Sequence, residues 1–229
     1  MAAGTLLQWD KIWAMNRPVL DSKATRYTAL LSEGIVPFKL TNAPSEPYAE
    51  TRWRHPKDES LGQTIRWFAP TVFLQNDDAS GLSVGEEITL MGWGNAIVRE
   101  VVRDAEGKLS LVGELHLEGS VKSTKKKITW LADEKDQMAA NVELIDLDHL
   151  LAKDKPEEDD TDEELYNKTT MYTYPAKCEA ALRLVHPGQV IQIERRGFYI
   201  CDKPFIRTKD PMRFIFVPDG KNMMGFKPK

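Results

Sequence analysis

The feature that most constrains the fold is a long series of short strand-like segments separated by turn residues, between residues 35 and 217. These segments are rich in apolar, β-branched or aromatic residues. They cover residues 35–40, 64–75, 87–90, 96–103, 108–117, 127–132, 142–147, 190–194, 198–201 and 212–217. Residues 104–107, with the sequence DAEG, form a hairpin turn between two of them. Many short strands at this spacing are typical of β-barrels or sandwiches, so we predict a mainly β protein.

The first segment has a helical pattern instead. Trp9, Ile12, Trp13 and Leu20 recur at helical spacing, and Pro18 is expected to break this helix or to open a second short one. The two tryptophans indicate a packed face, against either the chain's own core or a neighbouring domain. Elsewhere, residues 42–57 are predicted to form a loop and residues 176–184 a short helix.

The net charge of -4 conceals an uneven distribution. Residues 154–164 read DKPEEDDTDEE, with eight acids and one lysine, which is a net of -7. Without this segment the rest of the chain carries -4 + 7 = +3. We predict that the segment is a solvated acidic loop. A local basic surface, and not the total charge, decides whether a chain can bind a polyanion.

Several classes of function lack their sequence signals. There is no phosphate-binding glycine loop and no G-x-S-x-G motif, and the four histidines lie in separate segments. Cys178 and Cys201 do not form a C-x-x-C pair, so we expect reduced thiols and no metal site. No apolar run approaches the roughly 20 residues that span a bilayer, and residues 1–8 do not resemble a secretory signal. The sequence therefore favours binding over catalysis.

A basic cluster is the first candidate binding element. Lys122, Lys125, Lys126 and Lys127 lie between the strand-like residues 115–117 and 128–130, which indicates a hairpin tip. Phosphates would bind such a tip with release of counterions, and the affinity would then fall with salt. The alternative is an ordinary soluble surface turn.

Two further elements could contact bases. In residues 190–197, Gln192 and Glu194 share one strand face, and Arg195 follows at the turn. Gln and Arg can form paired hydrogen bonds with a base edge, although an exposed polar face of a barrel is the alternative. In residues 90–96, glycines flank Trp93, and Asn95 follows. Trp93 could stack an unpaired base and Asn95 bind its edge, or Trp93 could lie in the core at a β-bulge.

In this order the motifs resemble the C-terminal region of glutamyl-tRNA synthetases of the eukaryotic and archaeal type, which are kin of the glutaminyl enzymes. The resemblance covers the chain from about Trp9 to its end. It is carried by WDKIWAMN, RYTAL, GEEITLMGWGNA, LHLEGSVKSTKKKITWLA, DLDHLLAKDKPEEDD and GQVIQIERRGFYICD. It implies two stacked β-barrels after a short helical stem. The implied ranges are 1–30 for the stem, 31–75 with 175–229 for a proximal barrel, and 76–174 for a distal barrel with the acidic loop.

The resemblance also implies roles. Gln192 and Arg195 would read anticodon bases, and Asn95 and the lysines at 122, 125, 126 and 127 would contact the anticodon loop. The partners would be the tRNA(Glu) anticodon stem-loop and the enzyme's own catalytic domain. That domain is missing here, because neither a HIGH-like nor a KMSKS-like element occurs. It would bind ATP, whereas this chain would need no cofactor and would not contact a membrane. Residues 22–25 depart from the family pattern, which puts the local turn in doubt.

Three alternatives stay open at this point. The specificity could be for glutamine, or the parent protein could be a cytoplasmic synthetase fused to a second synthetase. The third alternative is a barrel used as a protein scaffold, whose lysine turn would dock an acidic partner. The resemblance favours a cytoplasmic glutamate–tRNA ligase.

Overall fold

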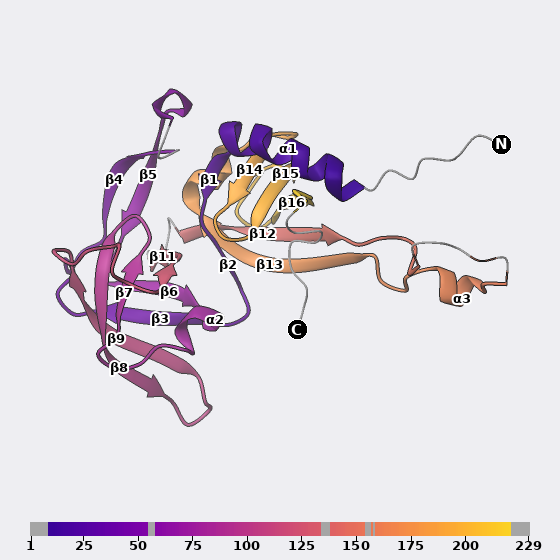
Figure 1. Cartoon of the computed structure of the whole chain (residues 1–229). Coiled ribbons are helices and arrows are strands. Elements are labelled where there is room, and N and C mark those ends of the chain that lie inside the picture. The colour runs from indigo at the N-terminus through magenta and orange to yellow at the C-terminus, as the bar shows by residue number, and fades with distance from the viewer. Residues whose placement is uncertain (1–8, 55–57, 134–137, 154–156, 158, 221–229) are drawn as a thin grey trace.

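The chain folds into two nearly closed, barrel-like sheets of seven strands each, preceded by one helix (Figure 1). This computed structural model describes residues 9–54, 58–133, 138–153, 157 and 159–220. The predicted fold class, two β-barrels after a helical stem, is confirmed. In the described part of the chain, no helix is long and apolar enough to cross a membrane.

Barrel I is the sheet formed by residues 35–132. Its order is β10-β7-β8-β9-β3-β6-β11. These strands are β3 (Ile35–Leu40), β6 (Thr71–Gln75), β7 (Glu87–Leu90), β8 (Gly94–Arg103), β9 (Leu109–His116), β10 (Lys127–Ile128) and β11 (Trp130–Ala132). Alternate residues of the strands point inward, and their burial forms one apolar core that includes Phe38, Leu74, Ile88, Leu111 and Trp130.

Barrel II combines residues 25–31 with residues 138–217. Its order is β1-β14-β15-β16-β12-β13-β2. These strands are β1 (Thr25–Tyr27), β2 (Ala29–Leu31), β12 (Met138–Leu147), β13 (Met171–Glu179), β14 (Val190–Ile193), β15 (Gly197–Lys203) and β16 (Met212–Val217). Helix α1 (Trp9–Lys23) lies beside this barrel, and Arg17 Nη1 is 3.2 Å from Oδ2 of the buried Asp219 (Figure 1).

The two sheets divide the chain differently from the expected barrel ranges. Residues 35–75 pair with the strands that follow them and not with residues 175–229, whereas β12 and β13 belong to barrel II. Strands that are consecutive in sequence usually pair or neighbour each other. Strand β3 and strands β6 to β11 therefore complete one barrel. Only afterwards do β13 and β14 pair with the early strands β2 and β1.

Three local predictions were wrong. Helix α1 continues through Pro18, because the ring removes one backbone donor without forcing the chain out of the helix here. The expected loop 42–57 contains β4 (Tyr48–Trp53), which pairs with β5 (Gln63–Phe68) as a separate two-stranded ribbon (Figure 1). Residues 176–179 belong to β13, and only the 3-10 turn η2 (Ala180–Leu184) follows.

The barrels meet where β2 of barrel II passes β6 of barrel I. Gln75, at the end of β6, accepts a hydrogen bond from the amide of Leu31 at 2.7 Å. Its side-chain nitrogen donates to the carbonyl oxygen of Glu33 at 2.8 Å. The short helix α2 (Asn76–Ala79) follows directly, so this corner of barrel I faces barrel II.

Candidate nucleic-acid interface

The lysine loop, residues 117–127, leads from β9 to β10 on barrel I. The structure differs here from the hairpin tip that the sequence indicated. Strand β9 pairs with β8 and β3, whereas β10 pairs in parallel with β7, so the loop is a crossover. Lys122, Lys125 and Lys127 are exposed, and Lys126 is partly buried.

Two of the four lysines are held by the protein itself. Lys126 Nζ donates to the carbonyl oxygen of Gly81 at 2.5 Å and lies 2.9 Å from Glu86 Oε1. Burial opposes ionisation of Glu86, but the hydrogen bonds from Lys126 and from a backbone amide outweigh it and lower its pKa. Lys127 Nζ donates to the carbonyl oxygen of Thr124. Among the contacts of the described residues, the side chains of Lys122 and Lys125 form no hydrogen bond or ion pair, so their charges can meet a polyanion.

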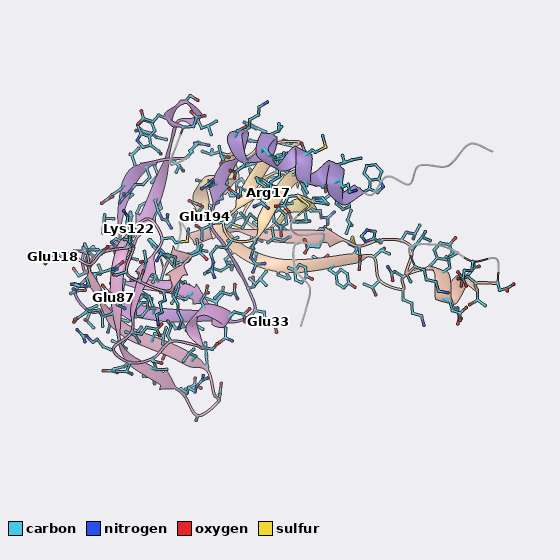
Figure 2. The ribbon with its side chains drawn as sticks, in the orientation of Figure 1. Arg17, Glu33, Glu87, Glu118, Lys122 and Glu194 are labelled. Carbon is cyan, nitrogen blue, oxygen red and sulfur yellow. The ribbon has the colours of Figure 1, made fainter. Side chains whose placement is uncertain are left out.

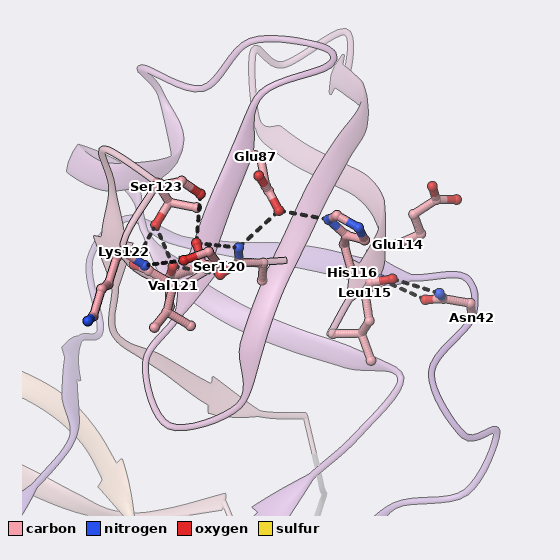
Figure 3. A network of polar contacts seen from close by, with 12 residues as sticks. Asn42, Glu87, Glu114, Leu115, His116, Ser120, Val121, Lys122 and Ser123 are labelled. Atoms are coloured by element: carbon pink, nitrogen blue, oxygen red, sulfur yellow. Dashed lines mark hydrogen bonds and ion pairs between the residues drawn. The ribbon is translucent and has the colours of Figure 1, made fainter. Parts of the chain in front are cut away.

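Asn95 holds the lysine loop in place through a polar network that includes Glu87 and Ser120, both labelled in Figure 3. Its side chain is fully buried. Its Oδ1 accepts from Thr89 Oγ1 at 2.8 Å, and its Nδ2 donates to Glu87 Oε1 at 2.9 Å and to the carbonyl oxygen of Ser120 at 3.2 Å. Thr89 in turn shares a hydrogen bond of 2.5 Å with the hydroxyl of Thr124. With no exposed surface, Asn95 has nothing to offer a base in this conformation, and it instead fixes the loop that carries the lysines.

Trp93 packs on the core and also lines open space. Its ring centroid lies 5.0 Å from that of Phe68 and 4.9 Å from that of Trp130, so much of the indole packs on the core of barrel I. The rest of it lines an open groove of about 370 Å³. The other lining residues are Asn42, Pro44, Tyr48, Leu115, His116, Leu117 and Glu118. An aromatic wall beside open space is a geometry on which a base can stack.

The glycine before Trp93 permits the close approach of an arginine. Gly92 has a φ of 74°, and a β-carbon there would lie 2.6 Å from Arg66 Nη1. The guanidinium carbon of Arg66 lies 4.7 Å from the ring centroid of Trp130, a cation–π contact. The open space left by Gly92 is therefore filled by an arginine of the same chain.

Arg66 belongs to an arginine cleft between barrel II and the β4–β5 ribbon. The cleft has a volume of about 380 Å³. It is lined by Arg26, Thr28, Arg52, Trp53, Arg54, Thr64, Arg66, Met91, Gly92, Glu179 and Glu194. Sequence reasoning missed the arginines. The signal that could have found them is the alternation of arginine with tryptophan in RWR at 52–54 and RW at 66–67.

Two carboxylates stand among these arginines. The backbone amide of Thr28 donates to Glu179 Oε1 at 2.6 Å, and its hydroxyl donates to Glu194 Oε2 at 3.0 Å. Burial raises the pKa of Glu179 to about 7, although the positive charge of Arg66 opposes that shift. The cleft therefore offers hydrogen-bond acceptors beside a surplus of guanidinium donors, which is the combination that recognises the edge of a nucleobase.

Gln192 lies next to this cleft. It pairs in register with Arg26 on the neighbouring strand β1, while Ile191 and Ile193 are buried in the core. The alternation predicted for this strand is confirmed. Glu194, the next residue on the outward face, lines the cleft at the junction of the barrels (Figure 2).

Arg195, the next residue after Glu194, contacts barrel I across the junction. Its Nη1 and Nη2 bind Asp78 Oδ2 and Oδ1 at 2.5 and 2.8 Å, a two-pronged contact between barrel II and barrel I. Both residues line a cavity of about 180 Å³ with Glu194 and Arg196. Of the predicted residues, Gln192 and Arg195 thus flank the junction, whereas Asn95 and the lysines belong to barrel I and its lysine loop.

The described residues contain no group of three or more His, Cys, Asp or Glu side chains arranged to hold a metal ion. Cys178 and Cys201 are free and buried. Burial raises the pKa of the Cys178 thiol, which keeps it protonated and unreactive.

The paired barrels and their basic junction define a double β-barrel suited to binding a single-stranded nucleic acid. Residues 24–118 and 127–202 match two family profiles, each described as the anticodon-binding domain of class I (E and Q) tRNA synthetases. The chain belongs to this family, the anticodon-binding domains of the glutamyl and glutaminyl enzymes.

Curated relatives agree with this placement. The chain is 41% identical over 94% of its length to the cytoplasmic glutamate–tRNA ligase of Arabidopsis thaliana, and 41% identical over 95% to a probable cytoplasmic glutamate–tRNA ligase of Schizosaccharomyces pombe. It is 34% identical over 93% to the bifunctional glutamate/proline–tRNA ligase of Mus musculus. The chain spans only 30% of the first two relatives and 14% of the third.

Proposed function

We propose that this chain recognises the anticodon of tRNA(Glu) as part of a cytoplasmic glutamate–tRNA ligase. The relatives' names support the amino acid and the compartment. The observation that carries the proposal is the arginine cleft at the junction of two anticodon-binding barrels. Its volume and its mixed donors and acceptors suit an extruded nucleobase.

Separate parts of the surface take separate parts of the anticodon loop. Arg26, Gln192 and Arg195 offer donors to base edges. Trp93 offers a stacking face. Each such contact contributes about 1–3 kcal/mol, which must exceed the cost of unstacking the loop. Lys122 and Lys125 meet the phosphates, and Asn95 acts indirectly by holding their loop.

Helix α1 connects this recognition to catalysis. Trp9, Ile12, Met15 and Val19 are exposed, and the rings of Trp9 and Trp13 stack with their centroids 6.3 Å apart. We assign this apolar face to contact with the catalytic domain of the same enzyme, which binds ATP and glutamate. Binding of the correct anticodon would then align the acceptor end of the tRNA for the reaction.

The test is a binding experiment with fluorescently labelled anticodon stem-loops. The cognate loop of tRNA(Glu), a loop with a changed anticodon and the loop of tRNA(Gln) are titrated with the chain at a low and a high salt concentration. We expect the cognate loop to bind most tightly, with a preference that survives at high salt. Tighter binding of the tRNA(Gln) loop would show that the chain is specific for the glutamine tRNA instead. Weak binding that ignores the anticodon and vanishes with salt would identify a scaffold instead.

A further inference from the structure

We propose that Asp78 of barrel I is a positioning residue that holds the guanidinium of Arg195 on barrel II in the orientation needed to read a base. The inference rests on the proposed function, in which Arg195 contacts the anticodon. It assigns a role to a residue that neither sequence motif nor resemblance singled out.

The contact has the geometry of a built site. Asp78 binds both terminal nitrogens of Arg195, at 2.5 and 2.8 Å, in the parallel arrangement that suits a planar guanidinium. Two of the five N–H donors of the guanidinium are thereby used. The side chain of Arg195 remains 44% exposed, whereas that of Asp78 is only 19% exposed. The acid is thus set into barrel I, and three donors of the half-exposed guanidinium are left for another partner.

The backbone of Arg195 is held in a costly conformation. With a φ of 65°, it is the one residue other than glycine with a positive φ among those that the structure describes. Such a conformation persists when the surroundings fix it. The preceding residue, Glu194, is bound by the hydroxyl of Thr28 at 3.0 Å and by the carbonyl oxygen of Tyr27 through its own amide at 2.9 Å. Asp78 fixes the other end of the same turn through the side chain.

The position of Asp78 is itself well fixed. It lies in α2, directly after Gln75, whose side chain bonds to residues 31 and 33 at the meeting point of the barrels. The backbone that carries the Asp78 carboxylate is therefore anchored to the segment that links the barrels. Arg195 therefore reaches a bound loop with its rotamer already chosen, which reduces the entropy that binding would otherwise remove.

Asp77 provides a matched control. It precedes Asp78 in the same helix and lines the same cavity, but it is exposed and forms no ion pair among the described residues. Asp77→Asn and Asp78→Asn remove the same charge from nearly the same place. If the lost negative charge merely repels RNA less, the affinity for RNA should rise in both variants. If Asp78 orients Arg195, discrimination between anticodon loops should fall only in Asp78→Asn.

The experiment measures a discrimination ratio, the Kd for the changed anticodon loop divided by that for the cognate loop. Both constants come from one preparation, so the folded fraction cancels. We expect Asp78→Asn and Arg195→Ala each to lower this ratio about tenfold. Asp77→Asn should leave it within about twofold, and Asp78→Asn should add nothing in the Arg195→Ala background, as expected for two residues that act as a unit.

Other outcomes separate the two proposals. If Arg195→Ala lowers the ratio and Asp78→Asn does not, the positioning role is overturned and the proposed function stands. If Asp78→Asn tightens cognate binding with an unchanged ratio, the carboxylate competes with RNA and the inference is wrong. If the unmodified chain shows no discrimination, the proposed function itself fails. If Arg195→Ala leaves the discrimination ratio unchanged, Arg195 does not read a base, and Asp78 has no positioning role.

Discussion

Lys126 Nζ lies 2.9 Å from Glu86 Oε1, so one lysine of the basic cluster is neutralised by its own protein. We predict that Lys122→Ala and Lys125→Ala each weaken binding of the anticodon stem-loop and reduce the salt dependence, the slope of log K against log salt, by about 1. Lys126→Ala should change that slope less. Titrations at four salt concentrations measure this, and equal slopes for all three variants would contradict the distinction.

Removal of the buried amide of Asn95 should loosen the lysine loop. Asn95→Ala leaves Glu87, Thr89 and the carbonyl oxygen of Ser120 without a partner that each now has. We expect a loss of about 1–3 kcal/mol in the free energy of unfolding, measured by urea denaturation. At a temperature where the variant is still folded, RNA binding should also weaken. Unchanged stability would show that the network can be replaced by water.

The carboxyl of Glu179 should make stability depend on pH. Its pKa rises from 4.5 to about 7 on folding, so the folded state holds the proton more tightly than the unfolded state. Its contribution to stability is therefore present below about pH 4.5 and is lost as the pH rises through about 7.

Glu179→Gln should remove this dependence. Relative to the unmodified chain, the variant should gain stability as the pH rises from 5 to 8, as followed by thermal unfolding at each pH. Glu194→Gln should only weaken the pH dependence, because the negative charge of Glu194 is a lesser cause of the raised pKa of Glu179, after burial. Parallel pH profiles for the unmodified chain and Glu179→Gln would refute the assignment.

Substitutions at Trp93 should separate the effect of core packing on stability from the effect of base stacking on RNA binding. Trp93→Ala removes contacts with Phe68 and Trp130 and should cost about 2–4 kcal/mol of unfolding free energy, and it should also weaken RNA binding. Trp93→Phe keeps an aromatic face, so we expect it to retain most of the affinity. If the two variants bind RNA equally well, Trp93 does not stack a base. Circular dichroism at the binding temperature confirms that both remain folded.

The strands could be predicted because their own residues encode them. The alternation of buried Ile191 and Ile193 with Gln192 is visible in the sequence and recurs in β14. The barrel division could not be predicted in the same way, because it depends on which strands pair. The parallel pairing of β3 with β9 joins residues about seventy positions apart, and no local pattern specifies such a partner.

The candidate site shows the same limit of sequence-based prediction, because contacts between distant residues are not visible in the sequence. A cluster of lysines is visible in the sequence, but the ion pair that removes Lys126 from it is not. The resemblance implied that Asn95 contacts the anticodon loop, yet its side chain is buried beneath the lysine loop, where it bonds to the carbonyl oxygen of Ser120. The arginine cleft was missed because its residues come from β1, β4, β5 and the β14 turn, which approach only after folding.

The β12–β13 ribbon carries α3 (Asp162–Leu165) far from barrel I, at the opposite end of the molecule from Lys122 (Figures 1 and 2). The acidic residues of α3 and the lysine loop therefore mark two poles of the described part of the molecule. Such a charge separation has a dipole moment, and the field of an approaching polyanion exerts a torque on the protein before the two touch. The lysine loop would then turn toward an approaching RNA, and collisions at the acidic pole would be unproductive.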